Sequence, residues 1–389
     1  MTKTFDALVC GGSLAGSAAA LVLARQGRSV AVLDRAVFPR PKLCGGLLTW
    51  KTVRLLETLF GETPASLAEA GAVNHASDRY VIRTPNRLLA EGALSFPFHF
   101  SDRAVLDALL LGHARRAGAE VFEGAEVAAC DPRNGEATLK TGETFRGRFL
   151  IGADGANSVV RKSFPNYDRD RWRELTAPTI EIQLDADRLP RVVEHPELYI
   201  GQLEAGYGWV FPNPGKAVLG ICGLRRGNVN FSSLFREYLE ILKIDPNTVS
   251  ERRGHPLPYG NYLEEPVCGA TLLAGDAGGF VEPLFGEGIF FALCTGRYAG
   301  EAVAAALAGG TDPGPLYVDR LRRYVLPELR GSDRLRWTLF RSMGLFGPRS
   351  LSWFVKLLAG PLGDMVHGKR SYVRLRKKTW DFPAPARPA

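Results

Sequence analysis

The chain has 389 residues, 46% of them hydrophobic, which is enough for two or three structural units with a full apolar core. No run of about eighteen apolar residues is present and the chain enters a strand-like segment almost at once, so we expect neither a transmembrane helix nor a signal peptide. Six cysteines without C-x-x-C spacing argue against a metal site, an iron–sulfur cluster or a disulfide framework, and favour a cytoplasmic protein. The net charge is +8, yet residues 311–389 alone hold 16 Lys and Arg against 6 Asp and Glu.

Residues 5–34 have the order of elements that is typical of a dinucleotide-binding unit. A strand over 5–10 leads into a glycine-rich turn over 11–16, a helix over 17–26 follows, and a strand over 29–33 ends at Asp34. Ser13 replaces the middle glycine of G-x-G-x-x-G. Small residues let the backbone approach a pyrophosphate, and a helix N-terminus offers free N–H groups. Rather than a turn kept for packing alone, we expect a cofactor site that includes Gly11, Gly12, Ser13, Ala15, Gly16, Asp34 and Arg35.

The next stretch, P-R-P-K-L-C-G-G over 39–46, combines stiff prolines with a glycine pair that permits close approach to a flat group. It resembles the corresponding segment of the geranylgeranyl reductase family, within the flavoprotein group that includes the aromatic hydroxylases. In that family the segment lies beside the flavin ring. The resemblance implies FAD as cofactor, contacts from Lys42, Cys44 and Gly45, and a catalytic role for Cys44, whose thiol could donate a proton. The alternative is that Cys44 is a small buried filler.

A helix is expected over 51–70, and strands over 73–100. Phe96, Phe98 and Phe100 share one strand face, where they either pack in a core or line an apolar tunnel. Ser101 suits the N-cap of a helix that reaches residue 116. Because the helix dipole disfavours a cation in the first turn, an anionic partner would explain Arg103 there. The resemblance implies that Arg103 reaches the phosphate or ribityl part of the cofactor.

Strands are expected over 118–127 and 138–144, and Val127 is included among the expected cofactor contacts. Residues 149–161 then read as an apolar strand, a sharp turn and a helix with Asn157 or Ser158 at its cap. The segment is similar to the G-A-D-G-x-x-S-x-V-R fingerprint of flavoprotein hydroxylases and prenyl reductases. This similarity implies that Asp154 and Gly155 contact the flavin, whereas the alternative is an ordinary acid between a strand and a helix.

Residues 169–256 contain strand-like runs at 179–184, 198–203, 208–212 and 217–224, and a helix is expected over 231–244. Tyr207, Trp209 and Phe211 would point the same way from one strand and form an aromatic wall for an unsaturated hydrocarbon. The run resembles the Y-x-W-x-F-P…G-x-G motif of geranylgeranyl reductases, although two residues separate Gly220 from Gly223. The expected substrate contacts are Tyr207, Trp209, Phe211, Pro212 and Gly220. The alternative is an aromatic face buried against the cofactor domain.

Residues 271–279 form a strand that ends in G-D-A, and a glycine-rich loop leads from there into a helix over 289–307. They look like the third fingerprint of the same flavoproteins, G-D-A…P-x-x-G-x-G. The resemblance implies that Gly275 and Asp276 hold the ribityl and pyrophosphate region. It also implies that Gly286, Gly288 and Ile289 bring a helix N-terminus to the flavin, where its dipole stabilises the anionic reduced ring.

In the basic tail, helices are expected between 315 and 380, with aromatic and aliphatic residues interleaved with Arg and Lys. Such a segment suits peripheral attachment to the inner face of a membrane, or a helical cap over the substrate cavity, or both. No nucleic-acid recognition module is visible, so we expect no nucleic acid as partner.

Together these segments predict an α/β protein with a Rossmann-like FAD-binding domain and a parallel sheet (1–72, 101–165 and 256–310). An antiparallel-sheet substrate domain (73–100 and 166–255) is interleaved with it, and a helical C-terminal extension (311–389) follows. The function that the resemblance implies is FAD-dependent reduction of C=C bonds in an isoprenoid or other apolar substrate. NADPH would dock transiently as electron donor, or reduced ferredoxin would bind the basic tail.

Other functions remain open at this point. The same flavin could serve a monooxygenase or halogenase acting on an apolar or aromatic substrate. A membrane-docked electron carrier to quinone is disfavoured because related quinone oxidoreductases add a four-cysteine cluster. A flavin-binding scaffold without activity is disfavoured by the intact Cys44-Gly45-Gly46 run.

Overall fold

The computed structural model describes residues 2–203, 205–224, 230–249, 252–346, 361–373 and 375–384. Its α-helices are α1 (Leu14–Arg25), α2 (Trp50–Phe60), α3 (Pro64–Glu69), α4 (Arg103–Arg116), α5 (Val159–Lys162), α6 (Arg169–Glu174), α7 (Phe231–Ile241), α8 (Ile289–Gly309), α9 (Gly314–Arg320) and α10 (Leu326–Phe346). Its strands are β1 (Lys3–Cys10), β2 (Val30–Asp34), β3 (Leu47–Leu48), β4 (Val73–Thr84), β5 (Arg87–Ser101), β6 (Glu120–Glu123), β7 (Val127–Asp131), β8 (Glu136–Leu139), β9 (Thr144–Gly152), β10 (Thr176–Asp185), β11 (Glu197–Ile200), β12 (Gly206–Asn213), β13 (Lys216–Gly223), β14 (Arg253–Pro258), β15 (Val267–Cys268) and β16 (Thr271–Leu273).

The first sheet has the order β15-β16-β9-β1-β2-β6, and the β7–β8 hairpin adds to it through β9. Strands β16, β9, β1, β2 and β6 run parallel. Both faces are covered: Ala7 and Val9 of β1 pack in the core that contains α1 and α8, whereas Leu8 and Cys10 pack in the core with α5, β8 and β9. Because both faces are buried, the strand is a continuous apolar run rather than an alternating one.

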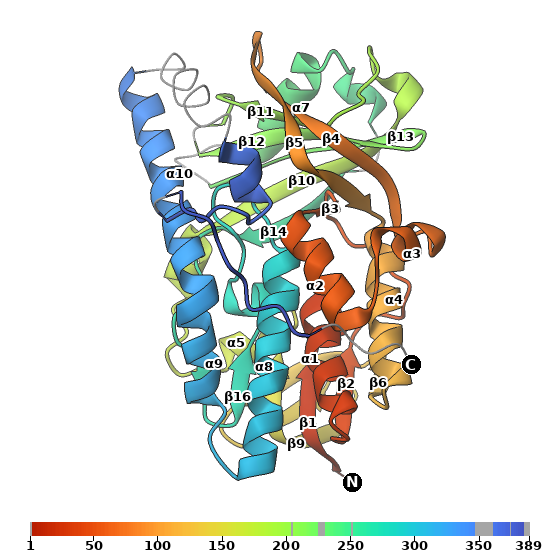
Figure 1. Ribbon diagram of the computed structural model, residues 1–389, viewed down its shortest axis with the longest axis vertical. Coiled ribbons are helices and arrows are strands. Elements are labelled where there is room, and N and C mark those ends of the chain that lie inside the picture. The colour runs from red at the N-terminus through yellow and green to blue at the C-terminus, as the bar shows by residue number, and fades with distance from the viewer. Residues whose placement is uncertain are drawn as a thin grey trace.

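The second sheet has the order β14-β10-β13-β12-β11-β4-β5-β3, and all its pairs are antiparallel except β11 with β4. Helix α7 covers one face, where Val210, Leu219 and Ile221 meet Phe235 and Leu239. In Figure 1 this sheet lies above the parallel sheet, and the long helix formed by α9 and α10 runs along the side of both. The predicted mixed α/β class, with a parallel sheet and a second sheet, is therefore confirmed.

Several predicted elements differ in detail. The helix expected over 51–70 is two helices, because Gly61 ends α2 in the left-handed conformation and Thr63 caps α3. Asp102, and not Ser101, caps α4, since its side chain accepts hydrogen bonds from the N–H groups of Ala104 and Val105. The strand expected over 138–144 contains the turn between β8 and β9.

The tail is helical from Gly314 to Phe346, with a π-helical turn at Leu321–Val325, so Pro327 and Gly331 do not interrupt this helix. The interruptions predicted over 347–360 lie outside the described residues. A short helical segment over 361–366 follows, and the described residues after it have no regular helix or strand. The predicted apolar positions Leu351, Trp353, Phe354, Leu357 and Leu358 lie outside the described residues. Within the described part, no helix is long and apolar enough to span a membrane.

Helices α1 and α8 cross at very short range. A Cβ at Gly296 would lie 2.1 Å from the carbonyl oxygen of Ala15, and one at Gly300 would lie 2.9 Å from that of Ala19. Backbone atoms cannot yield as a flexible side chain can, so both positions require glycine if the helices are to stay this close.

We expect Gly296→Ala to lower the free energy of unfolding by about 2 kcal/mol, because the added methyl group forces the two helices apart. The control is Gly309→Ala in the last turn of the same helix, where a Cβ would meet only Thr311, at 3.8 Å. Urea denaturation measures both. Equal destabilisation by the two variants would contradict the packing argument.

A buried carboxyl ties the loop before α8 to α10. Glu282 is fully buried, accepts hydrogen bonds from the N–H groups of Leu284 (2.9 Å) and Phe285 (2.6 Å), and accepts another from the Ser332 hydroxyl. Burial raises the pKa of Glu282 to about 7, against an ordinary value of 4.5. The folded protein therefore holds a proton here that the unfolded chain releases.

Since the folded-state pKa of Glu282 is raised, its contribution to stability is lost as the pH rises from about 4.5 to about 7. The difference in unfolding free energy between the wild type and Glu282→Gln should shrink by about 3 kcal/mol over that range. Denaturation curves at pH 5 and pH 7.5 test this. Parallel pH profiles for the two proteins would show that Glu282 does not titrate in this way.

Candidate active site

The glycine-rich turn joins β1 to the N-terminus of α1 at one end of a large cavity. Gly11 has φ +103°, and a Cβ there would lie 2.3 Å from the Ala153 carbonyl oxygen, while one at Gly16 would lie 1.7 Å from that of Gly11. The turn can therefore fold back against β9 only with glycine at both positions. Ser13, Leu14 and Ala15, at the start of α1, form part of the cavity wall.

Asp34 fastens the same turn to β2. One carboxylate oxygen accepts the N–H of Gly12 (2.7 Å) and the other accepts that of Ala36 (2.8 Å). Asp34 is buried, and each of its carboxylate oxygens keeps a lone pair that could accept a further hydrogen bond. Its predicted contact with the cofactor stays a prediction, and so does that of Arg35, which is exposed.

Positive charge accumulates around the N-terminus of α1. The buried guanidinium of Arg103 bonds the Asp107 carboxylate (2.9 Å), the Ser13 hydroxyl donates to Asp107 (2.7 Å), and Arg40 lies 3.6 Å from it. Lys42 approaches the Ser13 hydroxyl at 3.5 Å. Arg103 and Arg40 thus share the Asp107 carboxylate, and the Lys42 ammonium interacts electrostatically with Asp107 and Asp276.

The ionisation of these groups follows from their burial and their neighbours. Desolvation lowers the pKa of Lys42, and Arg103 lowers it further. Burial alone would raise the pKa of Asp107, but Arg103 and Lys42 outweigh it, so the net shift is downward. The uncompensated positive charge, set at a helix N-terminus, is the donor set that a pyrophosphate requires. The residues present therefore fit the diphosphate of FAD.

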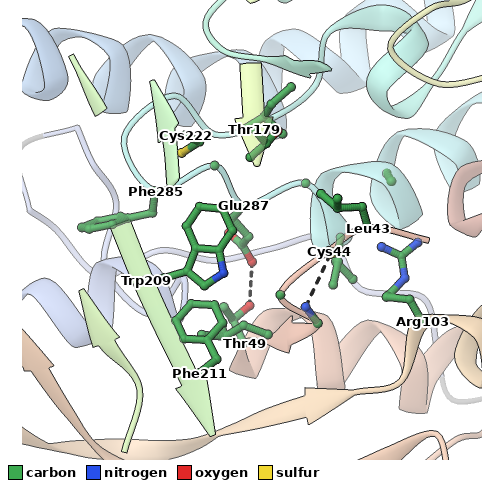
Figure 2. Close-up of a pocket in the computed structure, with 18 of the residues that line it drawn as sticks. Leu43, Cys44, Thr49, Arg103, Thr179, Trp209, Phe211, Cys222, Phe285 and Glu287 are labelled. Carbon is green, nitrogen blue, oxygen red and sulfur yellow. Dashed lines mark hydrogen bonds between the residues drawn. The ribbon is translucent and has the colours of Figure 1, made fainter. Parts of the chain in front are cut away.

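Cys44 lies where this cationic end meets the second sheet. Its N–H donates to Glu181 (3.1 Å), its sulfur lies 3.5 Å from the Gly46 nitrogen, and the Arg103 guanidinium approaches the sulfur from the other side. Figure 2 shows Cys44 with Arg103 beyond it, facing an opposite wall of aromatic rings. A Cβ at Gly45 would lie 2.7 Å from the Phe211 ring, so this glycine lets the loop lie flat against that wall.

The aromatic wall comes from β12. Tyr207, Trp209 and Phe211 point to the cavity with ring centroids 6.0 and 6.3 Å apart, while Val210 between them packs under α7. Gly220 makes room for the Trp209 indole, since a Cβ there would lie 2.5 Å from it. The Tyr207 hydroxyl donates to the Phe285 carbonyl, which ties the wall to the loop before α8.

That loop supplies the third part of the site. Gly275, Asp276, Gly286, Gly288 and Ile289 all lie on the cavity wall, so the N-terminus of α8 opens onto the cavity as that of α1 does. Glu287 is held by Lys51 (2.5 Å) and by the Thr49 hydroxyl (2.8 Å), as the dashed line in Figure 2 marks for Thr49.

The structure therefore brings most of the predicted residues together around one cavity. The cavity wall includes Ser13, Ala15, Lys42, Cys44, Gly45, Arg103, Gly155, Tyr207, Trp209, Phe211, Gly275, Asp276, Gly286, Gly288 and Ile289. It does not include Gly11, Gly12, Gly16, Asp34, Arg35, Val127, Asp154, Pro212 or Gly220.

Two of the residues outside the wall have other tasks. Asp154 accepts the N–H groups of Val159 (2.7 Å) and Val160 (3.2 Å), so it stabilises the start of α5. Its second carboxylate oxygen is buried without a partner. Val127 is the first residue of β7 and packs in the core beneath the β7–β8 hairpin. For Asp154 the geometry matches the alternative of an acid between strand and helix.

Some residues of the site were not predicted: Asp107, which lies behind Arg103, and the wall residues Glu181, Leu362, Gly363 and Val366. Asp107 could have been found from its i, i+4 spacing after Arg103 on one helix. Glu181 gave no signal, because an isolated acid in an alternating strand is normally solvated. Leu362, Gly363 and Val366 reach the cavity from the tail, and Phe98 lines it from β5, which matches the tunnel alternative for Phe98.

Comparison with known proteins identifies the family of the chain. The family model for the FAD binding domain matches residues 4–318. Geranylgeranyl diphosphate reductase of Rhodobacter capsulatus is 31% identical over 318 residues, which cover 79% of this chain and 76% of that protein. Menaquinone reductase of Mycolicibacterium smegmatis is 30% identical over 370 residues, covering 90% of this chain and 88% of that protein.

A solved structure also shares the fold. The geranylgeranyl bacteriochlorophyll reductase-like protein of Thermoplasma acidophilum superposes with a TM-score of 0.75 at 17% identity, over 96% of this chain and 98% of that one. The family model, both reductases and the site geometry lead to one assignment: the chain belongs to the geranylgeranyl reductase family of FAD-dependent oxidoreductases.

Proposed function

We propose that this FAD-dependent oxidoreductase reduces C=C bonds in an isoprenoid chain or another apolar molecule. The observation that carries the proposal is the two-sided cavity. One side is the cationic end of α1 with Lys42 and Arg103, and the other is an apolar wall from Tyr80, Ile82, Leu198, Trp209 and Phe211. A diphosphate fits the first side and a hydrocarbon fits the second.

When bound and reduced, FAD supplies a hydride. Lys42, Arg103 and the N–H groups at the start of α1 would hold its diphosphate, and the N-terminus of α8 would favour the anionic reduced ring. Trp209 and Phe211 would orient the unsaturated chain against it. Cys44 lies between the two sides, where it serves as an acid or as a positioning group for the substrate.

Two further parts of the proposal concern partners. The electron donor is NADPH, docking transiently, or reduced ferredoxin, an acidic protein that suits the basic region 311–389. The same region is suited to peripheral contact with anionic lipid on the inner face of a membrane. In the described part of the tail, Leu362 and Val366 support the role of a cap over the cavity.

The activity is tested without oxygen. Chemically reduced, FAD-loaded enzyme should convert geranylgeraniol to a product heavier by two hydrogens per bond reduced, with oxidation of the flavin in step. The fully saturated alcohol is the control and should leave the flavin reduced. Product that forms only when oxygen is admitted would overturn the reductase in favour of a monooxygenase. Repeating the turnover with NADPH and with reduced ferredoxin identifies the donor.

The cationic end gives a second expectation. Lys42→Met should weaken FAD binding by about ten- to a hundredfold, because a charge-assisted bond to the diphosphate is lost. Lys140→Met is the matched control, since Lys140 is exposed at the turn between β8 and β9 and pairs with Glu126. Fluorescence titration of the apoprotein measures both affinities. An unchanged affinity in Lys42→Met would remove this lysine from the cofactor site.

A further inference from the structure

Glu181 is a carboxyl on the cavity wall that the proposed reaction has not yet used. It lies in β10, between β13 and β14, where it pairs with Gly220 on one side and Arg253 on the other. Its neighbour Ile182 points into the core under α7, so the alternation of the strand turns Glu181 and Thr179 to the cavity. The side chain is 6% exposed.

Among the described residues, three carboxyls line this cavity: Glu181, Asp276 and Glu287. Glu287 is occupied by its ion pair with Lys51 and its bond from Thr49. Asp276 belongs to the loop before α8, on the side of the cavity that the cofactor diphosphate would occupy. Glu181 is therefore the carboxyl that faces the apolar side, next to Cys44 and the aromatic wall.

The contacts of Glu181 leave half of its carboxyl group unused. One oxygen accepts the N–H of Cys44 at 3.1 Å, and the other is buried without a hydrogen-bond partner. The Trp209 indole N–H faces the carboxyl outside regular hydrogen-bond geometry. A buried oxygen without a hydrogen-bond partner, on a residue that lines a cavity, is costly unless it carries a proton or meets a ligand.

The surroundings favour the neutral acid. The charged or titratable groups on the elements packed around Glu181 are Arg103 from α4, the Cys44 thiol from the loop, and His255 and Arg253 from β14. Burial raises the pKa of Glu181 to about 7, and the Cys44 N–H, Trp209 and Arg103 only partly oppose the shift. At neutral pH a large share of the molecules thus holds a proton at this position.

We propose that Glu181 is the general acid of the reduction, which protonates the substrate carbon from the cavity wall while Cys44 positions the substrate. The inference rests on the proposed function. One C=C bond is lost and two C–H bonds form: the reduced flavin gives the hydride, and Glu181 gives the proton. Glu181 is left as a carboxylate, which takes a proton from solvent before the next turnover.

The test compares Glu181→Gln with the wild type. Glutamine keeps an acceptor for the Cys44 N–H and is neutral like the acid, but it has no proton to donate. We expect kcat to fall by about 10²- to 10⁴-fold, with FAD affinity and KM nearly unchanged. The wild-type kcat should decline as the pH rises through about 7, and this decline should be absent from the residual activity of Glu181→Gln.

Three other variants sharpen the comparison. Glu181→Asp keeps a carboxylic acid and should restore the pH dependence at a reduced kcat. Cys44→Ala should lower kcat but keep the decline near pH 7. Glu282→Gln removes another buried acid whose pKa is raised to about 7 but which lies off the cavity wall, and it should keep the decline as well.

A second readout does not depend on turnover. Infrared difference spectra of the substrate-free protein, taken between pH 5 and pH 9, should show bands of titrating buried carboxyl groups. The band of Glu181 should be missing from Glu181→Gln and kept in Glu282→Gln, where the band of Glu282 is the one that is lost. A Glu181→Gln enzyme with wild-type kcat and the same pH dependence would overturn the assignment. A wild type that reduces no prenyl substrate without oxygen would instead overturn the proposed function, and the assignment with it.

Discussion

The close crossing of α1 and α8 is the constraint on which the site depends. Gly296 brings α8 against the backbone of Ala15, one residue after α1 begins. Each helix starts at the same end of the parallel sheet, so the crossing sets two helix N-termini, at Leu14 and Ile289, on one cavity. Segments 275 residues apart in the sequence therefore present two positive dipole ends to the same ligand.

The second sheet contributes the opposite wall, and its alternation explains how one strand serves two purposes. In β12, Val210 faces the core under α7, whereas Trp209 and Phe211 face the cavity. The Tyr238 hydroxyl donates to the Trp209 carbonyl at 2.9 Å and holds the strand from behind. The charged groups and helix N-termini of the cavity thus lie mainly on the side of the parallel sheet, and its apolar side chains mainly on the second, largely antiparallel sheet. Cys44 and Glu181 meet at the junction.

Local patterns in the sequence predicted the elements that carry their own signals. The glycine turn, the buried strand β1 and the aromatic alternation of β12 each depend on residues near one another in the chain. The sequence alone therefore predicts them. The cap of α4 was misplaced by one residue, because Ser101 and Asp102 are equally good caps and only the pairing of β5 decides between them. Asp107 carries only the weak local signal of its i, i+4 spacing from Arg103, whereas the role of Glu181 depends on burial by distant segments, which no local pattern records.

The tail contributes to the cavity wall through Leu362, Gly363 and Val366. The Lys51 ammonium bonds Glu287 on the α8 loop and donates to the Val366 carbonyl at 3.2 Å, and the Trp50 N–H donates to His367 at 3.0 Å. Burial lowers the pKa of His367 to about 3, so its ring is neutral and stacks on Phe98 with centroids 4.5 Å apart. One segment of the tail is thus fastened to the cofactor loop, to α2 and to β5. Because burial in a low-dielectric environment strengthens charge–dipole interactions and favours the neutral form of an acid, the packing of this segment against the cavity and the burial of Glu181 act in the same direction.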